Sequence, residues 1–268
     1  MKTYRIQHMS AVLAAVLQLS CAAVYAQSLS QEDALKLLQK TDASTSFEGT
    51  DFNACYSLVQ DKPGQGTSLT EAVMHRRDST ARYTILITSP AADKGKGYVQ
   101  FDSVLWFYDP HDNQFTFTSS KNKFQNTNAN NGDFAPMHFS RDYTVVSSSR
   151  VQLGAYKCVL FHLQAAVKNV DYPELKLWVT EEDGLLRKKE DYSLSGQLLR
   201  TTAIPSYQKV TDTRSVPYKM LIVDNLRGKK ISGKMQYEKT QITITNVTFD
   251  TQSDMVYTKN YLELMAKQ

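Results

Sequence analysis

The sequence predicts a mainly β protein built on one large antiparallel sheet. Its 268 residues are 41% hydrophobic and 22% charged, which gives enough apolar chain for a core and too much for a disordered segment. Apolar and polar residues alternate in many short runs, as at Tyr83, Ile85 and Ile87. Turn signals separate many of these runs, and 15 tyrosines and 11 phenylalanines favour strands.

The chain opens with the pattern of an export signal. Lys2 and Arg5 precede an apolar stretch at 9–26, which is shorter than the roughly 20 residues that a membrane span needs. We therefore expect residues 1–26 to be a signal peptide and 27–268 to be one exported domain.

A second interpretation of this segment makes Cys21 a lipidated N-terminus. The tetrapeptide at 19–22 partly resembles a lipobox, but Gln18 stands where that motif has leucine. Anchoring through Cys21 is the less favoured interpretation, and a soluble exported protein is expected.

The first element after the signal is a predicted helix at 31–40. Ser30 and Asp33 form a plausible capping box, and Leu35, Leu37 and Leu38 give a mostly one-sided apolar stripe.

The strands follow. They are predicted at 52–60, 82–88, 97–101, 103–108, 114–119, 156–165, 174–180, 185–193, 197–204, 218–223 and 241–249. Turn residues lie at 61–64, 109–112, 182–184 and 195–196. The polar stretch 121–136 predicts a mobile loop, and 255–266 suits either a short helix or a last strand.

Charge argues against a nucleic-acid partner. The 31 basic and 27 acidic residues give +4, and loss of Lys2 and Arg5 with the signal leaves about +2, which is weak and scattered. Basic clusters at 75–77, 187–189 and 229–230 suit either lipid head groups or ordinary solvated faces.

Catalysis, cofactors and metals find little support in the sequence. The five histidines are widely spaced, and none of the common hydrolase or phosphate-loop motifs occurs. Asp109, His111 and Asp112 suit a solvated turn better than a metal site. Cys55 and Cys158 are expected either to form a disulfide or to remain buried thiols.

Several strands carry large apolar side chains on alternate positions. Leu105 alternates with Phe107, and Phe115 alternates with Phe117, while Trp106, Tyr108 and Trp178 occupy the opposite positions of their strands. The pattern suits an ordinary core, and it also suits a ligand cavity.

The chain resembles the bacterial outer membrane lipoprotein-sorting protein family, relatives of the periplasmic carrier LolA. The segments that carry the resemblance are GKGYVQFDSVLWFYDP, YPELKLWVTEEDGLLRKKEDYSLSGQLLRT, VPYKMLIVDNL and VYTKNYLE, within about 70–263. The stretch 172–201 is the most specific part. The segment 132–143 matches loosely.

The resemblance implies an unclosed β-barrel, a strongly curved antiparallel sheet whose concave apolar face is partly covered by helices. It also implies a non-enzymatic periplasmic carrier of lipoprotein or lipid acyl chains. An inner-membrane transporter would be the donor and an outer-membrane protein the acceptor.

On this basis we expect Leu105, Phe107, Phe115 and Phe117 to line the concave face and to contact acyl chains. Trp106, Tyr108 and Trp178 form a reserve set, because a one-residue shift in a strand exchanges its two faces. Leu35 and Leu38 are expected to plug the cavity. Aspartate at both Phe107 and Phe117 is expected to abolish lipid binding.

Three other classes compete with the carrier. An outer-membrane barrel needs a lipid-facing apolar band, whereas the mean hydropathy of this chain is −0.41. A carbohydrate- or protein-binding β-sandwich would use exposed aromatic side chains, and a hydrolase would need residues gathered from distant strands.

Overall fold

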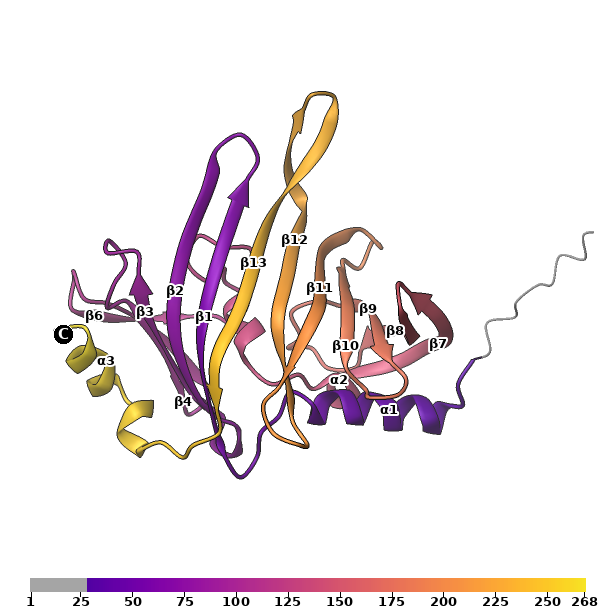
Figure 1. Cartoon of the computed structure of the whole chain (residues 1–268), viewed down its shortest axis with the longest axis horizontal. Coiled ribbons are helices and arrows are strands. Elements are labelled where there is room, and N and C mark those ends of the chain that lie inside the picture. Colours follow the sequence, from indigo (N-terminus) through magenta and orange to yellow (C-terminus); the bar gives the residue numbers. More distant parts are fainter. Residues whose placement is uncertain (1–27) are drawn as a thin grey trace, which may run out of the picture.

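The computed structural model describes residues 28–268, so the predicted signal peptide and Cys21 lie outside the described residues. The chain folds into one thirteen-stranded antiparallel sheet with three short α-helices (Figure 1). The strands are β1 Asp51–Lys62, β2 Gly66–Arg77, β3 Arg82–Ser89, β4 Gly97–Phe101, β5 Val104–Asp109, β6 Gln114–Thr118, β7 Tyr143–Leu153, β8 Tyr156–Ala165, β9 Glu174–Thr180, β10 Leu186–Tyr192, β11 Leu198–Lys209, β12 Ser215–Ile231 and β13 Lys234–Thr248. The α-helices are α1 Gln31–Ala43, α2 Phe139–Asp142 and α3 Lys259–Met265.

The sheet is a meander with one long connection. Its spatial order is β6-β5-β4-β3-β2-β1-β13-β12-β11-β10-β9-β8-β7, so β1 pairs with β13 at the centre and β6 and β7 stand at opposite edges. The sheet is therefore not closed into a barrel. The chain passes from β6 to β7 through residues 119–142, which we call the crossing segment.

One face of the sheet, here called the inner face, carries the main core. Alternation places apolar side chains on this face along most strands, as with Tyr56 and Leu58 in β1 and Ile242 and Ile244 in β13. Helix α1 adds Leu37 and Leu38, both buried, while Leu35 is exposed and faces away from the core. The predicted helix is confirmed, with Ser30 as its N-cap. The expectation that Leu35 plugs the cavity is wrong.

The crossing segment lies over the inner face, and the predicted mobile loop at 121–136 is wrong. Phe124 and Phe134 are buried in the main core. The backbone N–H of Asn128 donates to Gln60 Oε1 of β1 at 3.1 Å and to Thr240 Oγ1 of β13 at 2.7 Å. The sheet therefore supplies the hydrogen bonds of a backbone N–H group that would bond to water in an exposed loop.

The outer face carries a smaller second core beneath the C-terminal segment. The 3₁₀-helix Asp254–Tyr257 and α3 cover β3, β4 and β5, and Leu262 of α3 packs on Val99 and Tyr108. The segment 255–266 is thus helical, which settles the alternative that its sequence left open. Two further 3₁₀-helices span Asp78–Thr80 and Asn131–Phe134.

Most of the predicted strands and turns are confirmed. The strands at 97–101, 156–165 and 174–180 match β4, β8 and β9, and the four turn signals fall in connections between paired strands. Two strands, β2 and β7, were not predicted. Within residues 28–268, no helix is long and apolar enough to cross a bilayer.

Candidate functional site

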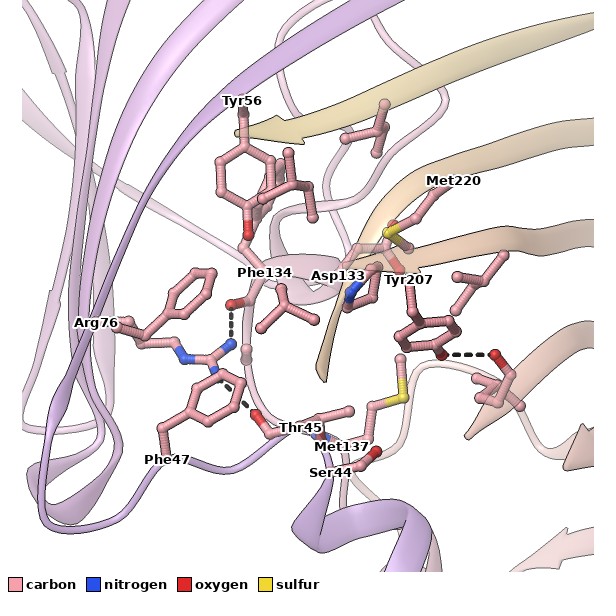
Figure 2. Close-up of a pocket in the computed structure, with 18 residues that line it drawn as sticks. Ser44, Thr45, Phe47, Tyr56, Arg76, Asp133, Phe134, Met137, Tyr207 and Met220 are labelled. Carbon is pink, nitrogen blue, oxygen red and sulfur yellow. Dashed lines mark hydrogen bonds between the residues drawn. The ribbon is translucent and has the colours of Figure 1, made fainter. Parts of the chain in front are cut away.

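An apolar cavity lies between the inner face and the crossing segment (Figure 2). Its volume is about 70 Å³. The residues around it come from the loop after α1, from the crossing segment and from β1, β2 and β10–β13: Ser44, Thr45, Phe47, Phe52, Tyr56, Arg76, Asp133, Phe134, Ala135, Met137, Leu186, Ile204, Tyr207, Val216, Pro217, Met220, Ile242 and Ile244.

Arg76 of β2 lines one end of the cavity and joins three segments there. Its Nη1 donates to the Phe134 carbonyl oxygen at 2.9 Å, and its Nη2 donates to the Thr45 carbonyl oxygen at 2.6 Å (Figure 2). Its Nε lies 2.8 Å from Asp78 Oδ1, and the guanidinium lies 5.2 Å from the ring centroid of Phe47. One buried side chain therefore ties the crossing segment and the loop after α1 to the sheet.

A second arginine, Arg200 of β11, holds the crossing segment from the other side. Its Nη1 and Nη2 donate to the two carboxylate oxygens of Asp133 at 2.6 and 2.9 Å, and its Nε donates to Asp191 at 2.8 Å. Burial opposes ionisation of Asp133, but the nearby Arg200 outweighs it and lowers the pKa of Asp133 below its usual value. Lys189 also pairs with Asp191 at 2.8 Å, so this cluster is charge-balanced.

Helix α1 is joined to the crossing segment by a carboxylate. Asp42 accepts hydrogen bonds from the backbone N–H groups of Phe139 and Ser140, both at 2.8 Å, and from Ser140 Oγ at 2.6 Å. Thr45 Oγ1 accepts from the Met137 N–H at 3.0 Å. The crossing segment is thus attached at both ends of the cavity by hydrogen bonds, which water can replace when the segment moves.

The crossing segment also buries polar atoms that lack partners in the described part of the chain. They are Asn128 Nδ2 and Asn131 Oδ1. Each buried polar atom without a partner costs about 1–3 kcal/mol. The closed arrangement is therefore less stable than its buried phenylalanines alone would make it.

The cavity wall is uncharged apart from groups that are already paired. Burial raises the pKa of Tyr56 to about 12, and it raises the pKa of Tyr207, whose hydroxyl donates to the Leu186 carbonyl oxygen at 2.6 Å. Arg76 and Asp133 are held in the ion pairs described above. The remaining surface is aliphatic, aromatic and thioether, which suits a hydrocarbon chain.

The register of β5 and β6 divides the predicted lipid-binding residues between the two faces. Leu105 is buried in the main core and Phe107 packs against it. Phe115 lies opposite Tyr108, and Phe117 lies opposite Trp106, so these four residues share the outer face. The expectation that Leu105, Phe107, Phe115 and Phe117 share one face is therefore wrong.

The reserve residues lie away from the cavity. Lys259 Nζ of α3 stands 3.3 Å from the ring centroid of Trp106, and Tyr108 is buried under the same helix. Trp178 lies between the inward-facing Leu177 and Val179, and Lys188 Nζ stands 4.3 Å from its ring centroid. Their role in lipid binding stays a prediction without support from their position.

Two of the three basic clusters are largely engaged within the protein. Arg76 and Arg77 pair with Asp78 and Asp51, and Lys189 pairs with Asp191. In the cluster at 229–230, both lysines are exposed and neither forms an ion pair with a described residue.

The alternative left open for the two cysteines is decided by the structure. Cys55 and Cys158 are free thiols. No group of three or more His, Cys, Asp or Glu side chains within 28–268 is placed to hold a metal ion.

Sequence reasoning did not identify the residues that define the cavity. Met137, Tyr207 and Met220 come from segments far apart in the chain, and only the fold brings them together. Arg76 was noted only as part of the basic cluster at 75–77, and its inward position became visible only once β2 was known.

The fold is similar to that of solved structures from the LolA superfamily and from related families. The chain is similar to a LolA superfamily protein from Nitrosomonas europaea, with 22% identity, a TM-score of 0.69, and coverage of 85% of this chain and 98% of that one. A putative outer membrane lipoprotein-sorting protein domain from Vibrio parahaemolyticus has 15% identity, a TM-score of 0.73, and coverage of 87% and 100%. A DUF1329 family protein from Desulfovibrio piger has 16% identity, a TM-score of 0.73, and coverage of 87% and 98%.

Sequence comparison places the chain in one family. The family model described as "Uncharacterized protein" matches residues 79–264, and because this is more than half of the chain, the protein belongs to that family. No curated protein matches the sequence.

Proposed function

We propose that this protein is an exported, non-enzymatic carrier that binds the acyl chains of lipids or lipoproteins between the inner face and the crossing segment. The observation that carries the proposal is an apolar cavity closed by a segment that polar contacts attach to the sheet. A hydrocarbon site needs apolar walls, and a carrier also needs a cover that can open.

The small volume of the cavity requires that it enlarge to admit an acyl chain. It measures about 70 Å³, whereas pockets for small ligands span about 300–1,000 Å³. The crossing segment would have to move away to admit a chain, and its buried rings, Phe124 and Phe134, would leave apolar space on the inner face. Leu105 and Phe107 belong to the core of that face and remain our candidates for chain contacts.

Binding exchanges the contacts of the crossing segment for the burial of an acyl chain, and both contribute free energy. Removing a chain of about 16 carbons from water stabilises a complex by up to about 13 kcal/mol, at ~0.8 kcal/mol per methylene. Opening forfeits the burial of the crossing segment and its hydrogen bonds, each worth a net ~1 kcal/mol. The unpaired asparagine atoms lower that cost, because they regain water. Binding and release are both feasible on this balance.

The cellular setting completes the proposal. A signal peptide at 1–26 would deliver the chain to the periplasm of a bacterium with two membranes. A transporter in the inner membrane would supply the cargo and a protein of the outer membrane would accept it. No nucleic acid takes part.

Native mass spectrometry tests the proposal directly. The protein is purified without detergent from its own cell envelope, sprayed intact, and extracted with organic solvent. We expect a co-purified acylated molecule. A protein that carries none, and that also refuses added fatty acids and phospholipids, would contradict the proposal.

A pair of variants tests the position of the site. Met220 lines the cavity, while its neighbour Leu221 points to the other face of β12. Met220→Gln places an amide of similar size in the hydrocarbon site, so we expect fatty-acid affinity to fall by about tenfold, whereas Leu221→Gln leaves it unchanged. Fluorescent fatty-acid titration measures both, with circular dichroism as the check on folding. Equal affinities would place the chain elsewhere.

A further inference from the structure

The hairpin of β12 and β13 extends beyond the paired parts of the neighbouring strands as a two-stranded ribbon, and the side chain of Lys229 lies against Gly64 in the β1–β2 turn. The pairing of β11 with β12 reaches Asp224, and the pairing of β1 with β13 begins at Lys239. Residues 225–238, here called the tip ribbon, therefore pair only with each other. Figure 1 shows this hairpin projecting past the neighbouring strands.

The tip ribbon holds most of the net charge of the protein. It contains four basic residues, Arg227, Lys229, Lys230 and Lys234, and one acidic residue, Glu238, which gives a net charge of +3 out of +4 for the whole chain. The three lysines form no ion pair with the residues that the structure describes. Arg227 pairs with Asp224 at 4.0 Å, so the three lysines are the unneutralised positive charges of the ribbon.

Exposed apolar side chains accompany these cations. Leu226 and Met235 are each 55% exposed, and Tyr237 is 40% exposed. Met235 lies opposite Lys230 in the ladder, and Tyr237 lies opposite Gly228. An isolated hairpin is only marginally stable in water, and no third strand pairs with this one. Folding of the sheet gives no reason for them to be apolar.

The cations lie on both faces of the ribbon. Lys229 and Lys230 are consecutive strand residues, so they point to opposite faces, and Lys234 lies opposite Ile231 on the face of Lys229. A protein groove that received the ribbon would cover one face. A lipid head-group layer entered from above would contact both faces at once.

We propose that the tip ribbon docks the protein end-on to an anionic phospholipid surface. The lysine ammonium groups bind the lipid phosphates, and Met235, Tyr237 and Leu226 enter the boundary between head groups and acyl chains, where tyrosine is enriched. The long lysine stems let the charges reach the phosphates while the apolar side chains lie deeper. This inference does not depend on the proposed carrier function, because the ribbon contributes no residue to the cavity.

Vesicle flotation tests the proposal on the chain from Ser28 onward. That range holds every strand of the sheet, and it leaves out the apolar stretch 9–26, which would bind vesicles by itself. Vesicles of phosphatidylglycerol and phosphatidylethanolamine are compared with vesicles of phosphatidylcholine. We expect binding to the anionic vesicles alone, with a marked loss at high salt.

Two variants and a charge-matched control identify the ribbon as the contact. In K229Q/K230Q/K234Q, we expect binding to anionic vesicles to fall by at least about tenfold. M235S/Y237S keeps the charge and should weaken binding by a smaller factor. The control K94Q/K157Q/K168Q removes three exposed lysines elsewhere and should bind like the unmodified protein. Circular dichroism checks the fold of each variant.

Three outcomes would overturn the proposal. The first is that the unmodified protein does not float with anionic vesicles, and the second is that the ribbon variant and the control lose binding equally. The third is a dimer, detected by sedimentation, that M235S/Y237S converts to a monomer. The last result would assign the ribbon to a second copy of the chain. Fatty-acid titration of the ribbon variant should remain normal in every case, which keeps this test separate from that of the cavity.

Discussion

Two buried arginines, Arg76 and Arg200, fix the position of the crossing segment. Each is an exception to the apolar inner face, and each directs its guanidinium at a backbone carbonyl or a carboxylate of the segment. Guanidinium groups hold such oxygens with defined geometry, and removal of one partner leaves a buried charge exposed to an apolar environment. At the scale of single residues, the closed state therefore depends on directional polar contacts as well as on packing.

The ion pair of Asp133 should make the stability of the protein depend on pH. Its pKa is lowered in the folded protein, so the carboxylate contributes stability above the pKa of an unfolded aspartate, about 3.9, and this stability is lost as the pH falls through the folded value. We expect Asp133→Asn to lower the free energy of unfolding by about 2 kcal/mol at neutral pH. At an acid pH below the lowered pKa of Asp133 the difference should shrink, because the native residue is itself protonated there. Urea denaturation at both pH values measures it.

The control for this experiment is Asp212→Asn. Asp212 is fully exposed and forms only a surface ion pair with Lys209, so its substitution should leave stability nearly unchanged at either pH. A loss for Asp133→Asn that stayed constant down to acid pH would indicate damage to packing instead of a lost ion pair.

At the scale of elements, period-two alternation predicted the strands where one face is apolar and failed where it is not. In β9, Leu175, Leu177 and Val179 all face inward, and the predicted and observed bounds agree. β7 is an edge strand with three consecutive serines at 147–149, so its sequence carries no apolar alternation. In β2 the inward side chains include Thr70 and Arg76, whose burial depends on partners from other segments.

The crossing segment marks the limit of prediction from a single sequence. Its asparagines are typical of an exposed loop, yet Asn128, Asn130 and Asn131 are buried because the sheet and the neighbouring turns supply hydrogen bonds. The sequence also could not predict which side chains of β6 face the core. The turn at 110–113 sets the register of β6 against β5, and a shift of one residue would move Phe115 to the other face. The apolar residues could be predicted as buried, but their cavity could not.

This register leads to a prediction about two phenylalanines on neighbouring strands. Phe107 packs against the main core near Tyr98, with 5.1 Å between ring centroids, whereas Phe117 is 70% exposed on the outer face. We expect Phe107→Asp to reduce fatty-acid affinity by at least about tenfold, because it places a charge on the inner face. Phe117→Asp should change affinity by less than about twofold. Binding that is lost only with Phe117→Asp would show that the outer face receives the chain.

Phe107→Asp also needs a check on folding, since the side chain is partly buried. Phe107→Ser is the milder companion, and it should lower affinity in the same direction while the β-sheet spectrum persists. Both variants are titrated with the same fluorescent fatty acid as Phe117→Asp.

At the scale of the whole molecule, the open topology of the sheet accounts for the crossing segment. The meander leaves β6 and β7 at opposite edges, so the chain must traverse the sheet once to connect them. That traverse supplies the cover of the inner face from within the chain itself. A closed barrel would need no such connection, and its interior could not be opened by displacing one segment.

Hydrogen exchange of the intact protein tests whether the cover moves when a chain binds. The backbone N–H groups of Asn128, Met137, Phe139 and Ser140 donate to side chains of the sheet or of α1 and its following loop, so they report on closure. With palmitate bound, we expect these amides to exchange at least about tenfold faster, because the cavity of about 70 Å³ is too small for the chain in the closed state. Amides of the central strands β1 and β13 should keep their protection and serve as the internal reference. Unchanged protection of the four reporters in a protein saturated with palmitate would mean that the chain binds without opening the crossing segment, and that a site other than the closed cavity receives it.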